Sequence, residues 1–302
     1  MKGIIVVNAY YFSGEIQYQP TRLQEEFAER GVSCEIIKNT TIPCGTEKTG
    51  NFLKMDPTDF CVFLDKDKYL LLALENSGIR VFNRPRTIRI CDDKMETAIF
   101  LADRGIPMPV TIAGPLCYRP EASFSEEFER TAERELGYPF VFKECYGSRG
   151  TGVRMVRGRQ EFERVWEANK TKAYLLQEYI EESSGRDIRV LMIGGKAAGA
   201  IERRNDTDFR SNLAAGGEGK PYRLDGDLVH LCEKTASVLE ADYCGIDVLV
   251  SSRGYLICEV NSNAFFGGFE KVTGINAAGL YADHILRQVQ KQTEKRGEKN
   301  GN

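Results

Sequence analysis

The sequence predicts an α/β domain over roughly the first ninety residues, followed by a mixed α+β region. Two observations support this division. Up to residue 82, short apolar runs alternate with helical patterns, which is typical of a parallel sheet covered by helices. Beyond residue 88, short strand patterns lie beside glycine-rich turns and hairpins instead. A chain of 302 residues is also long enough for one large core or roughly two to three smaller ones.

The first domain is expected to contain alternating strands and helices. Its first strand is indicated by the apolar run Ile4 to Val7, and its first helix ends at Gly31. Residues 39–51 are rich in Thr, Gly and Pro and are expected to form a loop. The segment Asn83 to Arg86 interrupts the pattern, so we place the domain boundary near residue 88. The expected strands are 3–8, 32–37, 60–64 and 79–82, and the expected helices are 21–30 and 67–76.

The second region is expected to form two subdomains, residues 89–172 and 173–290. It begins with a helix over 95–104 that Asp92 caps and Gly105 ends. The glycine pair Gly194-Gly195 predicts a hairpin. The tail, residues 291–302, is polar and is expected to fray. The expected strands are 139–143, 153–156, 173–179, 187–193, 196–202, 243–250 and 255–260, with helices through 162–166 and over 224–240 and 276–289.

Composition and charge exclude several classes of protein. Hydrophobic residues make up 42% and charged residues 28% of the chain, as in a soluble folded protein. The 41 basic and 44 acidic residues give a net charge of −3, so no overall positive field favours nucleic acid or an anionic membrane. No apolar run approaches the roughly 18 residues of a membrane helix.

Cysteine and histidine usage points to a reduced compartment. The nine cysteines are scattered and never spaced as C-x-x-C, which argues against a disulfide framework or a zinc site and favours the cytoplasm. The two histidines, His230 and His284, are each expected on a helix surface. Catalysis built on several histidines is therefore not expected.

A glycine-rich segment after a predicted strand could cover phosphates. Lys143 ends the strand, and Gly147, Gly150 and Gly152 follow it. Backbone amides without side chains approach phosphate oxygens closely, and a lysine adds a point charge. The lysine precedes the glycines and a strand follows them, so neither the P-loop nor the Rossmann fingerprint fits. A flexible hairpin without a ligand is the alternative.

Three oxygen-bearing residues on a predicted hairpin could hold a metal. Glu259 and Asn261 are two residues apart and share a strand face, and a reversal near residues 252–253 brings Asp247 opposite them. The neighbouring residues are apolar, and buried unpaired carboxylates are costly. An all-oxygen set suits Mg²⁺. The alternative is surface carboxylates on an edge hairpin.

Two further segments are weaker indications of a phosphate site. Residues 200–204 contain two arginines, and residues 209–213 another, next to the glycine-rich loop 214–219. Arginines beside such a loop can clamp a phosphoryl group. Residues 175–179 with Asp187 could offer backbone groups to an adenine and a carboxylate to a ribose.

Taken in order, these motifs resemble the ATP-grasp superfamily, and most closely its RimK-like alpha-L-glutamate ligases. The resemblance covers about residues 85–290 and rests on Asp92-Asp93-Lys94, the Lys143 loop, QEYI at 177–180, Asp187, IERR at 201–204, FRSNL at 209–213, GID at 245–247 and EVN at 259–261. It implies a small Rossmann-like α/β domain followed by a two-subdomain ATP-grasp fold, and amide formation from a carboxylate, an amine and ATP.

The resemblance also implies roles for individual residues. Arg203 would contact the acyl phosphate and Arg210 the nucleotide phosphates, which makes these two the catalytic candidates. The nucleotide would be held by Lys94 and Lys143 at the phosphates, Glu178 and Tyr179 at the adenine, Asp187 at the ribose, and Arg210, Ser211 and Asn212 at the phosphates. Two Mg²⁺ ions, or Mn²⁺ in their place, would be bound by Asp247, Glu259 and Asn261.

These observations lead to the hypothesis of a cytoplasmic, homo-oligomeric ligase that joins a carboxylate to an amine, glutamate or another amino acid. The alternatives are an ATP-grasp phosphotransferase and a nucleotide-binding module without turnover. Residues 262–271 differ from the family's Ser-Pro-Gly-type segment. We expect the acceptor site between the amino-terminal domain and the loop 262–269, near the magnesium ligands. Phe265, Phe266 and Phe269 would then contact an apolar acceptor or pack against that domain.

Overall fold

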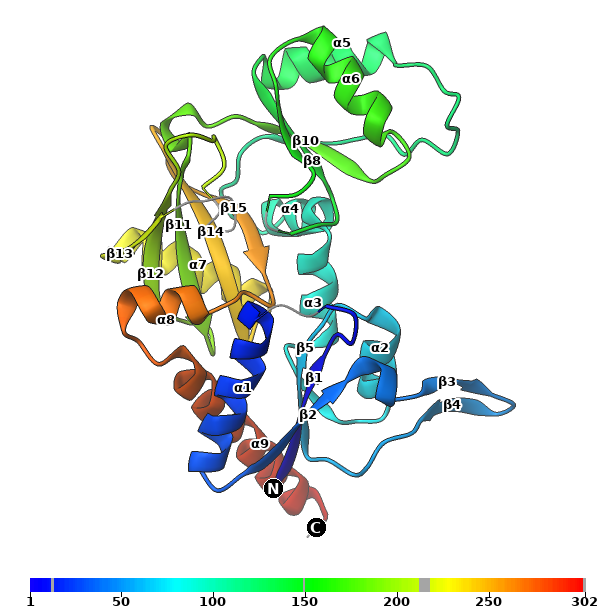
Figure 1. The fold of residues 1–302 in the computed structure, drawn as a ribbon, viewed down its shortest axis with the longest axis vertical. Coiled ribbons are helices and arrows are strands. Elements are labelled where there is room, and N and C mark those ends of the chain that lie inside the picture. Colours follow the sequence, from blue (N-terminus) through cyan, green and yellow to red (C-terminus); the bar gives the residue numbers. More distant parts are fainter. Residues whose placement is uncertain (12–13, 149, 212–217, 301–302) are drawn as a thin grey trace.

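The computed structural model describes residues 1–302 except 12–13, 149, 212–217 and 301–302. The chain forms three units stacked along the long axis of the molecule, each built around one sheet (Figure 1). The amino-terminal sheet has the order β2-β1-β5-β6 and is parallel throughout, as the alternating pattern predicted. Its strands are β1 (Lys2–Val7), β2 (Ser33–Lys38), β5 (Phe60–Leu64) and β6 (Arg80–Phe82).

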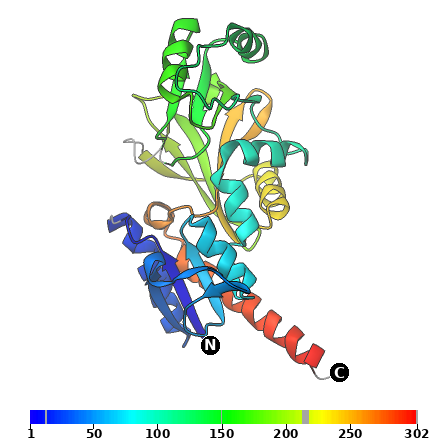
Figure 2. The ribbon, with the colours of Figure 1, turned by 90° about the vertical axis from the view of Figure 1, so that its right-hand side faces the viewer.

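Helices from both ends of the chain cover the amino-terminal sheet. Figure 2 shows the carboxy-terminal helix lying against this unit and projecting beyond it. One hydrophobic core joins Phe27, Phe60 and Phe82 with Tyr281 and Ile285 of that last helix. The helices of this unit are α1 (Gly14–Glu29), α2 (Lys68–Asn76), α3 (Pro85–Asp92) and α9 (Ala277–Asn300).

The second unit is a four-stranded sheet with two helices on one face (Figure 1). Phe140, Phe142 and Leu176 of its strands pack against Phe162 and Trp166. Successive side chains of a strand point to opposite faces, so Val141 and Lys143 lie on the face away from these helices, where they line a cavity. The sheet order is β7-β10-β8-β9, formed by β7 (Thr111–Ala113), β8 (Phe140–Glu144), β9 (Val153–Val156) and β10 (Tyr174–Glu178), with helices α5 (Glu126–Leu136) and α6 (Arg159–Asn169).

The third unit is an antiparallel sheet of order β13-β12-β11-β14-β15. Leu101, Leu228 and Cys232 lie in one core with the strand residues Val190 and Ile246, so the helices before and within this unit cover its face. Its elements are α4 (Lys94–Ala102), β11 (Arg186–Ile193), β12 (Lys196–Arg204), β13 (Glu218–Tyr222), α7 (Gly226–Val238), β14 (Tyr243–Ser251), β15 (Gly254–Asn261) and α8 (Gly267–Thr273).

The structure corrects several predicted boundaries. Residues 39–51 are not a loop: they contain a 3-10 turn, Asn39–Thr41, and most of a hairpin of β3 (Cys44–Glu47) and β4 (Gly50–Leu53). Helix α1 begins at residue 14, seven residues before the predicted start, with Pro20 inside it. Asp93, not Asp92, caps α4, accepting hydrogen bonds from the amides of Met95 and Glu96. Helices α3, α5 and α8 and strands β7 and β13 were not predicted.

The tail and one histidine also differ from prediction. Helix α9 continues to residue 300, so the prediction that residues 291–302 fray is wrong for most of that range. Lysine, glutamate and glutamine in this segment favour a helix. His284 is buried and its Nε2 lies 3.0 Å from Asp242 Oδ1, whereas His230 is exposed as expected. His284 is buried because it lies on the face of α9 that packs against the sheets.

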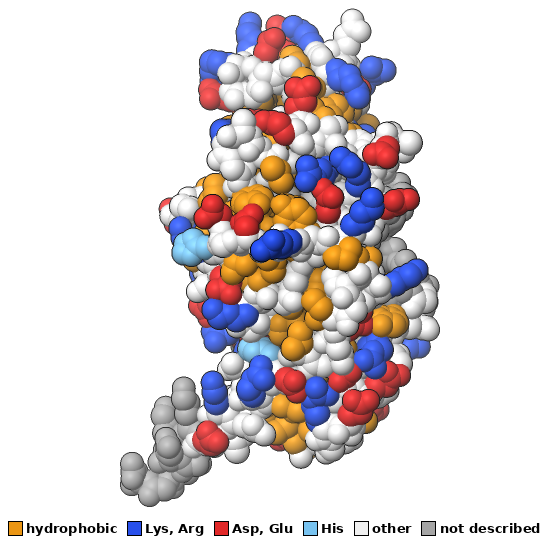
Figure 3. All heavy atoms as spheres, turned by 90° about the vertical axis from the view of Figure 1, so that its left-hand side faces the viewer, with side chains coloured by type: hydrophobic (Ala, Val, Ile, Leu, Met, Phe, Trp, Pro, Cys, Tyr) orange, Lys and Arg blue, Asp and Glu red, His pale blue; other side chains and the backbone are white. Residues whose placement is uncertain are grey.

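The surface mixes charges of both signs. On the face shown in Figure 3, basic and acidic side chains lie next to one another, with hydrophobic side chains between them. Within the described part of the chain, no helix combines the length and apolar character needed to cross a membrane.

Candidate active site

A cavity between the second and third sheets gathers the predicted nucleotide-binding residues. Strands β8 and β10 line it from one side, and β11, β14 and β15 from the other. Asn212 lies outside the described residues. The predicted residues that line this cavity are Lys94, Lys143, Glu178, Tyr179, Asp187, Arg210, Ser211, Asp247 and Glu259.

Two lysines reach into this cavity from different elements. The Lys143 Nζ on β8 is buried and donates to Gln177 Oε1 at 2.6 Å, with Cys258 Sγ at 3.4 Å. The Lys94 Nζ, at the start of α4, donates to the Gly147 carbonyl at 2.9 Å and lies 3.7 Å from Glu259 Oε1. Both cations therefore face the space beside the glycine-rich turn, where phosphates would meet them.

An ionic cluster forms the floor between the sheets. Arg203 Nε donates to Asp187 Oδ1 at 2.7 Å, and Arg203 also bonds Asp247 at 2.9 Å. Arg189 holds the same Asp247 carboxylate through two hydrogen bonds, one of 2.8 Å. Burial alone would raise the pKa of Asp247, but the two guanidiniums outweigh burial and lower the pKa to about 2. Asp247 is therefore an anion at neutral pH.

The metal-binding candidates lie where the sequence predicted. The chain reverses between Ser251 and Gly254, Asp247 pairs with Glu259, and Asn261 pairs with Gly245 further along. The Asp247 side chain is only 6% exposed, unlike the surface carboxylate of the alternative interpretation. Among the described residues, no group of three His, Cys, Asp or Glu side chains is placed to hold a metal ion; the candidate set consists of two carboxylates and an asparagine amide. Oxygen donors of this kind fit Mg²⁺.

The nucleotide cavity adjoins a second, larger cleft of about 1300 Å³. This cleft lies between the amino-terminal unit and residues 261–271, and Ser148 lines both spaces. Arg203 and Asn261, the two remaining predicted residues, line the large cleft. The metal-binding candidates therefore stand at the junction of the two spaces.

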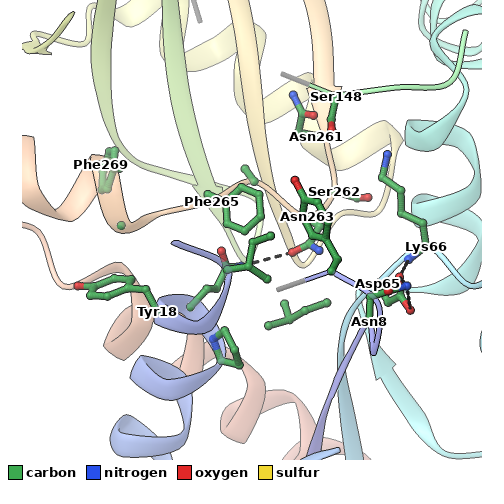
Figure 4. A pocket seen from close by; sticks show the side chains of 18 of the residues that line it. Asn8, Tyr18, Asp65, Lys66, Ser148, Asn261, Ser262, Asn263, Phe265 and Phe269 are labelled. Carbon is green, nitrogen blue, oxygen red and sulfur yellow. Dashed lines mark hydrogen bonds between the residues drawn. The ribbon is translucent and has the colours of Figure 1, made fainter. Parts of the chain in front are cut away.

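The phenylalanines after β15 have different positions. Phe265 lines the large cleft and is partly exposed, and Phe269 lines it from α8. Figure 4 shows Phe265 facing the pocket from the segment between β15 and α8, with Asn261 and Ser148 at its other end. Phe266 is fully buried, with its ring edge-on to Tyr18 and Tyr243. Packing rather than acceptor contact therefore explains Phe266.

Sequence reasoning missed several residues of this site. Arg189 lies two positions after Asp187 on β11, so both point to the same face, and that spacing could have identified it. Gln177 and Cys258 contact the Lys143 ammonium; Gln177 begins the QEYI motif but was given no role, and Cys258 lies outside the motifs. Tyr18 was missed because only the folded chain brings α1 under α8, where its hydroxyl donates to Glu270 at 2.7 Å.

A lysine-bearing antiparallel sheet faces a second sheet that carries oxygen donors, and a cavity lies between the two. This arrangement defines the ATP-grasp class. Comparison with family models refines this: residues 91–285 match the RimK-like ATP-grasp domain. The chain belongs to the RimK-like ATP-grasp family. The resemblance inferred from the motifs is confirmed, as is the expected combination of α/β and α+β units.

Curated relatives are similar over the same part of the chain. The sequence is 35% identical to beta-citrylglutamate synthase B of Danio rerio over 74% of this chain and 54% of that protein. It is 33% identical to N-acetylaspartylglutamate synthase A of Homo sapiens over 74% of this chain and 56% of that protein. It is 35% identical to the ribosomal protein bS6–L-glutamate ligase of Escherichia coli, over 72% and 71% of the two chains. The chain spans about half the length of the first two.

Solved structures share the fold at low sequence identity. A RimK domain ATP-grasp protein of Sphaerobacter thermophilus superposes with a TM-score of 0.71 at 21% identity, over 94% of this chain and 99% of that one. D-alanine–D-alanine ligase of Bacillus anthracis, solved with ATP, gives 0.72 at 18% identity, over 98% and 99%. The ATP-grasp ligase PsnB, solved with a minimal precursor, Mg and ADP, gives 0.68 at 17%, over 95% and 98%.

Proposed function

We propose that this protein is an ATP- and Mg²⁺-dependent ligase that joins a carboxylate to an amine, releasing ADP and phosphate. The observation that supports this most directly is the junction of the two spaces: the oxygen donors and Arg203 stand between the cavity that gathers the nucleotide-binding candidates and a large cleft. A reaction at the γ-phosphate needs its acceptor at that point. The names of the curated relatives, all synthases or ligases of glutamate-containing products, are consistent with it.

Residues on both sheets would bind the nucleotide. Lys94 and Lys143 would contact the phosphates, and Arg210 and Ser211 would approach them from the third unit. Glu178 and Tyr179 would border the adenine at the end of β10. Arg253 anchors the Glu178 carboxylate through contacts of 2.7 and 2.8 Å, which fixes this border.

Asp187 would face the ribose. It also accepts hydrogen bonds from Arg203, so it would orient that guanidinium while the nucleotide is bound. Asp247, Glu259 and Asn261 would hold the metal ions. Mg²⁺ bound there would neutralise charge on the triphosphate.

The chemistry follows from these positions. An acceptor carboxylate oxygen attacks the γ-phosphorus, the bond to the β-phosphate oxygen breaks, and ADP leaves. An amine then attacks the carbonyl carbon of the acyl phosphate, loses a proton to solvent, and phosphate leaves. Arg203 would stabilise the developing negative charge, since a guanidinium offers paired donors to phosphoryl oxygens. No side chain needs to act as a nucleophile. Glutamate is the first amine to test.

The test measures ADP and amide product with purified protein, MgATP, a panel of carboxylic acids and a panel of amino acids. ADP release should require both a carboxylate and an amine. ADP formation with an alcohol alone, accompanied by a phosphorylated alcohol, would identify a phosphotransferase. Binding of ATP without any turnover would identify a nucleotide-binding module.

A matched pair of variants tests the metal assignment. Glu259→Ala should reduce turnover at least a hundredfold, with little change in melting temperature, because the metal loses a ligand and Glu259 is partly solvated. Glu233→Ala is the control, since Glu233 on α7 forms a surface ion pair with Lys196 and does not line either space of the site; this variant should keep full activity. Near wild-type activity of Glu259→Ala at saturating Mg²⁺ would show the assignment to be wrong.

A further inference from the structure

The large cleft has features that select the acceptor. We infer that the acceptor is a carboxylic acid with one anionic group and a bulky apolar body, larger than a single amino acid. The inference rests on the proposed function and concerns the same site. Three observations support it: the volume of the cleft, the ion pairs that already neutralise most of its cations, and the exposed aromatic rings in its lining.

The volume exceeds what a small acid fills. Typical sites for drug-sized molecules hold about 300–1,000 Å³, whereas this cleft holds about 1300 Å³. A small hydroxy acid or a single amino acid would leave much of that space to water. Part of the cleft would admit the incoming amine, and the remainder suits an acceptor with a large body.

The cations of the cleft are largely neutralised by the protein itself. Arg189 and Arg203 are held by Asp247 and Asp187. Lys66 lies 2.5 Å from Asp92. Among the residues that the structure describes, Lys271 is the cleft lysine or arginine for which no ion pair is found. A polyanionic acceptor would need several uncommitted cations to offset its desolvation, so a single carboxylate fits this lining better.

Aromatic side chains face the cleft from both walls. Tyr10, between β1 and α1, is 82% exposed, and Phe265, on the opposite wall, is 40% exposed. Tyr18, which is 40% exposed, adds a ring beneath α8, whereas Phe269 borders the cleft but is buried in the core. Large exposed rings gathered at one concave site indicate an apolar ligand.

The two ends of the cleft give the acceptor an orientation. In Figure 4, Asn261 and Ser148 lie at one end, and Phe265 and Tyr18 lie toward the other. An acid with its carboxylate at the Asn261 end would place its apolar body among the rings. The carboxylate then meets the γ-phosphate at the junction of the two spaces.

Binding by isothermal titration calorimetry tests this without turnover. The protein is loaded with Mg²⁺ and a non-hydrolysable ATP analogue, and 4-phenylbutyrate, indole-3-butyrate, decanoate, citrate, N-acetylaspartate and a polar tripeptide are compared. The apolar monoacids should bind at least tenfold more tightly than the other three. Tighter binding of citrate or N-acetylaspartate overturns the single-anion inference, and tighter binding of the polar tripeptide overturns the apolar body. Aryl acids that outbind decanoate would support an aromatic body.

Variants connect the effect to the named rings. Phe265→Ala and Tyr10→Ala should each weaken the best monoacid about tenfold, or about 1.4 kcal/mol, with less than twofold change for the nucleotide analogue. Tyr69→Ala is the matched control, because Tyr69 is 71% exposed on α2 and does not line the cleft. Lys271→Met should change affinity less than twofold. Unchanged binding in both aromatic variants, or a tenfold loss in Lys271→Met, overturns the inference.

The experiments distinguish failure of this inference from failure of the proposed function. If the monoacids bind as expected but no amine yields an amide, the inference on the cleft holds and the ligase proposal does not. If ADP and an amide form only with small polyanionic acids, the ligase proposal holds and the inference is overturned.

Discussion

Replacing Glu26 by glutamine should loosen the contact between the first and last helices. Glu26 is buried on α1 and accepts hydrogen bonds from Arg22 at 2.6 Å, Arg30 at 2.7 Å and Asn276 at 2.7 Å. Arg30 also bonds Asp283 of α9 at 2.6 Å. This network therefore holds the start of α9 on α1, beside the large cleft.

The expected loss follows from those bonds. Hydrogen bonds to a charged group contribute about 1.5–3 kcal/mol each. The oxygen of a glutamine would still accept some of these hydrogen bonds. Both arginines are about a quarter exposed, so solvent screening further reduces the expected loss. We expect a loss of about 2 kcal/mol in the free energy of unfolding at pH 7. With an unfolding entropy of about 2.1 cal/mol/K per residue, this loss lowers the melting temperature by about 3 °C. Glu25→Gln is the control: the Glu25 side chain is 53% exposed and forms a surface ion pair with Arg22, so a loss of less than about 0.5 kcal/mol is expected.

The pH dependence of this loss is a second check. Burial by itself would raise the pKa of Glu26, but hydrogen bonds from Asn276, Arg30 and Arg22 outweigh it and hold the pKa below its ordinary value of 4.5. A carboxylate with a lowered pKa stabilises the fold fully above its unfolded value, and this stabilisation is lost as the pH falls through the folded value. Urea unfolding followed by circular dichroism should therefore show the full difference at pH 7 and a smaller one below pH 4.5. A difference that stays constant in acid, or that equals the effect of Glu25→Gln, would refute this reasoning.

Three other substitutions have defined outcomes. Gly185→Ala should lower the melting temperature strongly, because Gly185 has φ +64° and a Cβ there would lie 2.2 Å from the Asn205 carbonyl oxygen. The control Gly195→Ala, at φ +78° with open space around it, should reduce the free energy of unfolding by only about 1–2 kcal/mol. Equal losses in the two variants would contradict the clash at Gly185. Phe266→Ala should destabilise by about 3–5 kcal/mol while the Michaelis constants of the folded protein change little, and a selective rise for the acceptor would contradict the packing role. Lys143→Met should raise the Michaelis constant for ATP at least tenfold in a steady-state assay, and an unchanged constant would remove Lys143 from the phosphate site.

The sequence predicted the strands better than the helices. Residues 4–7 and 60–64 are continuous apolar runs, and such a run, buried on both faces of its sheet, can be recognised from the local sequence alone. Helix α5 has only a few buried positions among charged residues, so its apolar stripe is weak. Helix α3 begins at a proline, which is favourable at a first helical turn but was interpreted as an interruption.

Prediction of the site depended on spacing within one element. Glu259 and Asn261 lie on one strand and Asp247 on its hairpin partner, so local geometry placed them together. Tyr18, Phe265 and Lys66 come from α1, the segment after β15, and the chain after β5, and no local rule relates these positions. The grouping of the nucleotide-binding candidates was therefore largely foreseeable, as was the place of the large cleft beside Phe265, whereas its lining from α1 and from the chain after β5 was not.

The shared core of α9 and the amino-terminal sheet has a consequence for synthesis of the protein. The apolar faces of α1 and β5, with Phe27 and Phe60, are completed by residues near Tyr281 and Ile285. At about 5–20 residues per second, roughly 10–40 s separate the emergence of these two parts from the ribosome. During that interval the nascent amino-terminal unit exposes an uncovered hydrophobic face, which makes it a target for chaperones until the last helix arrives.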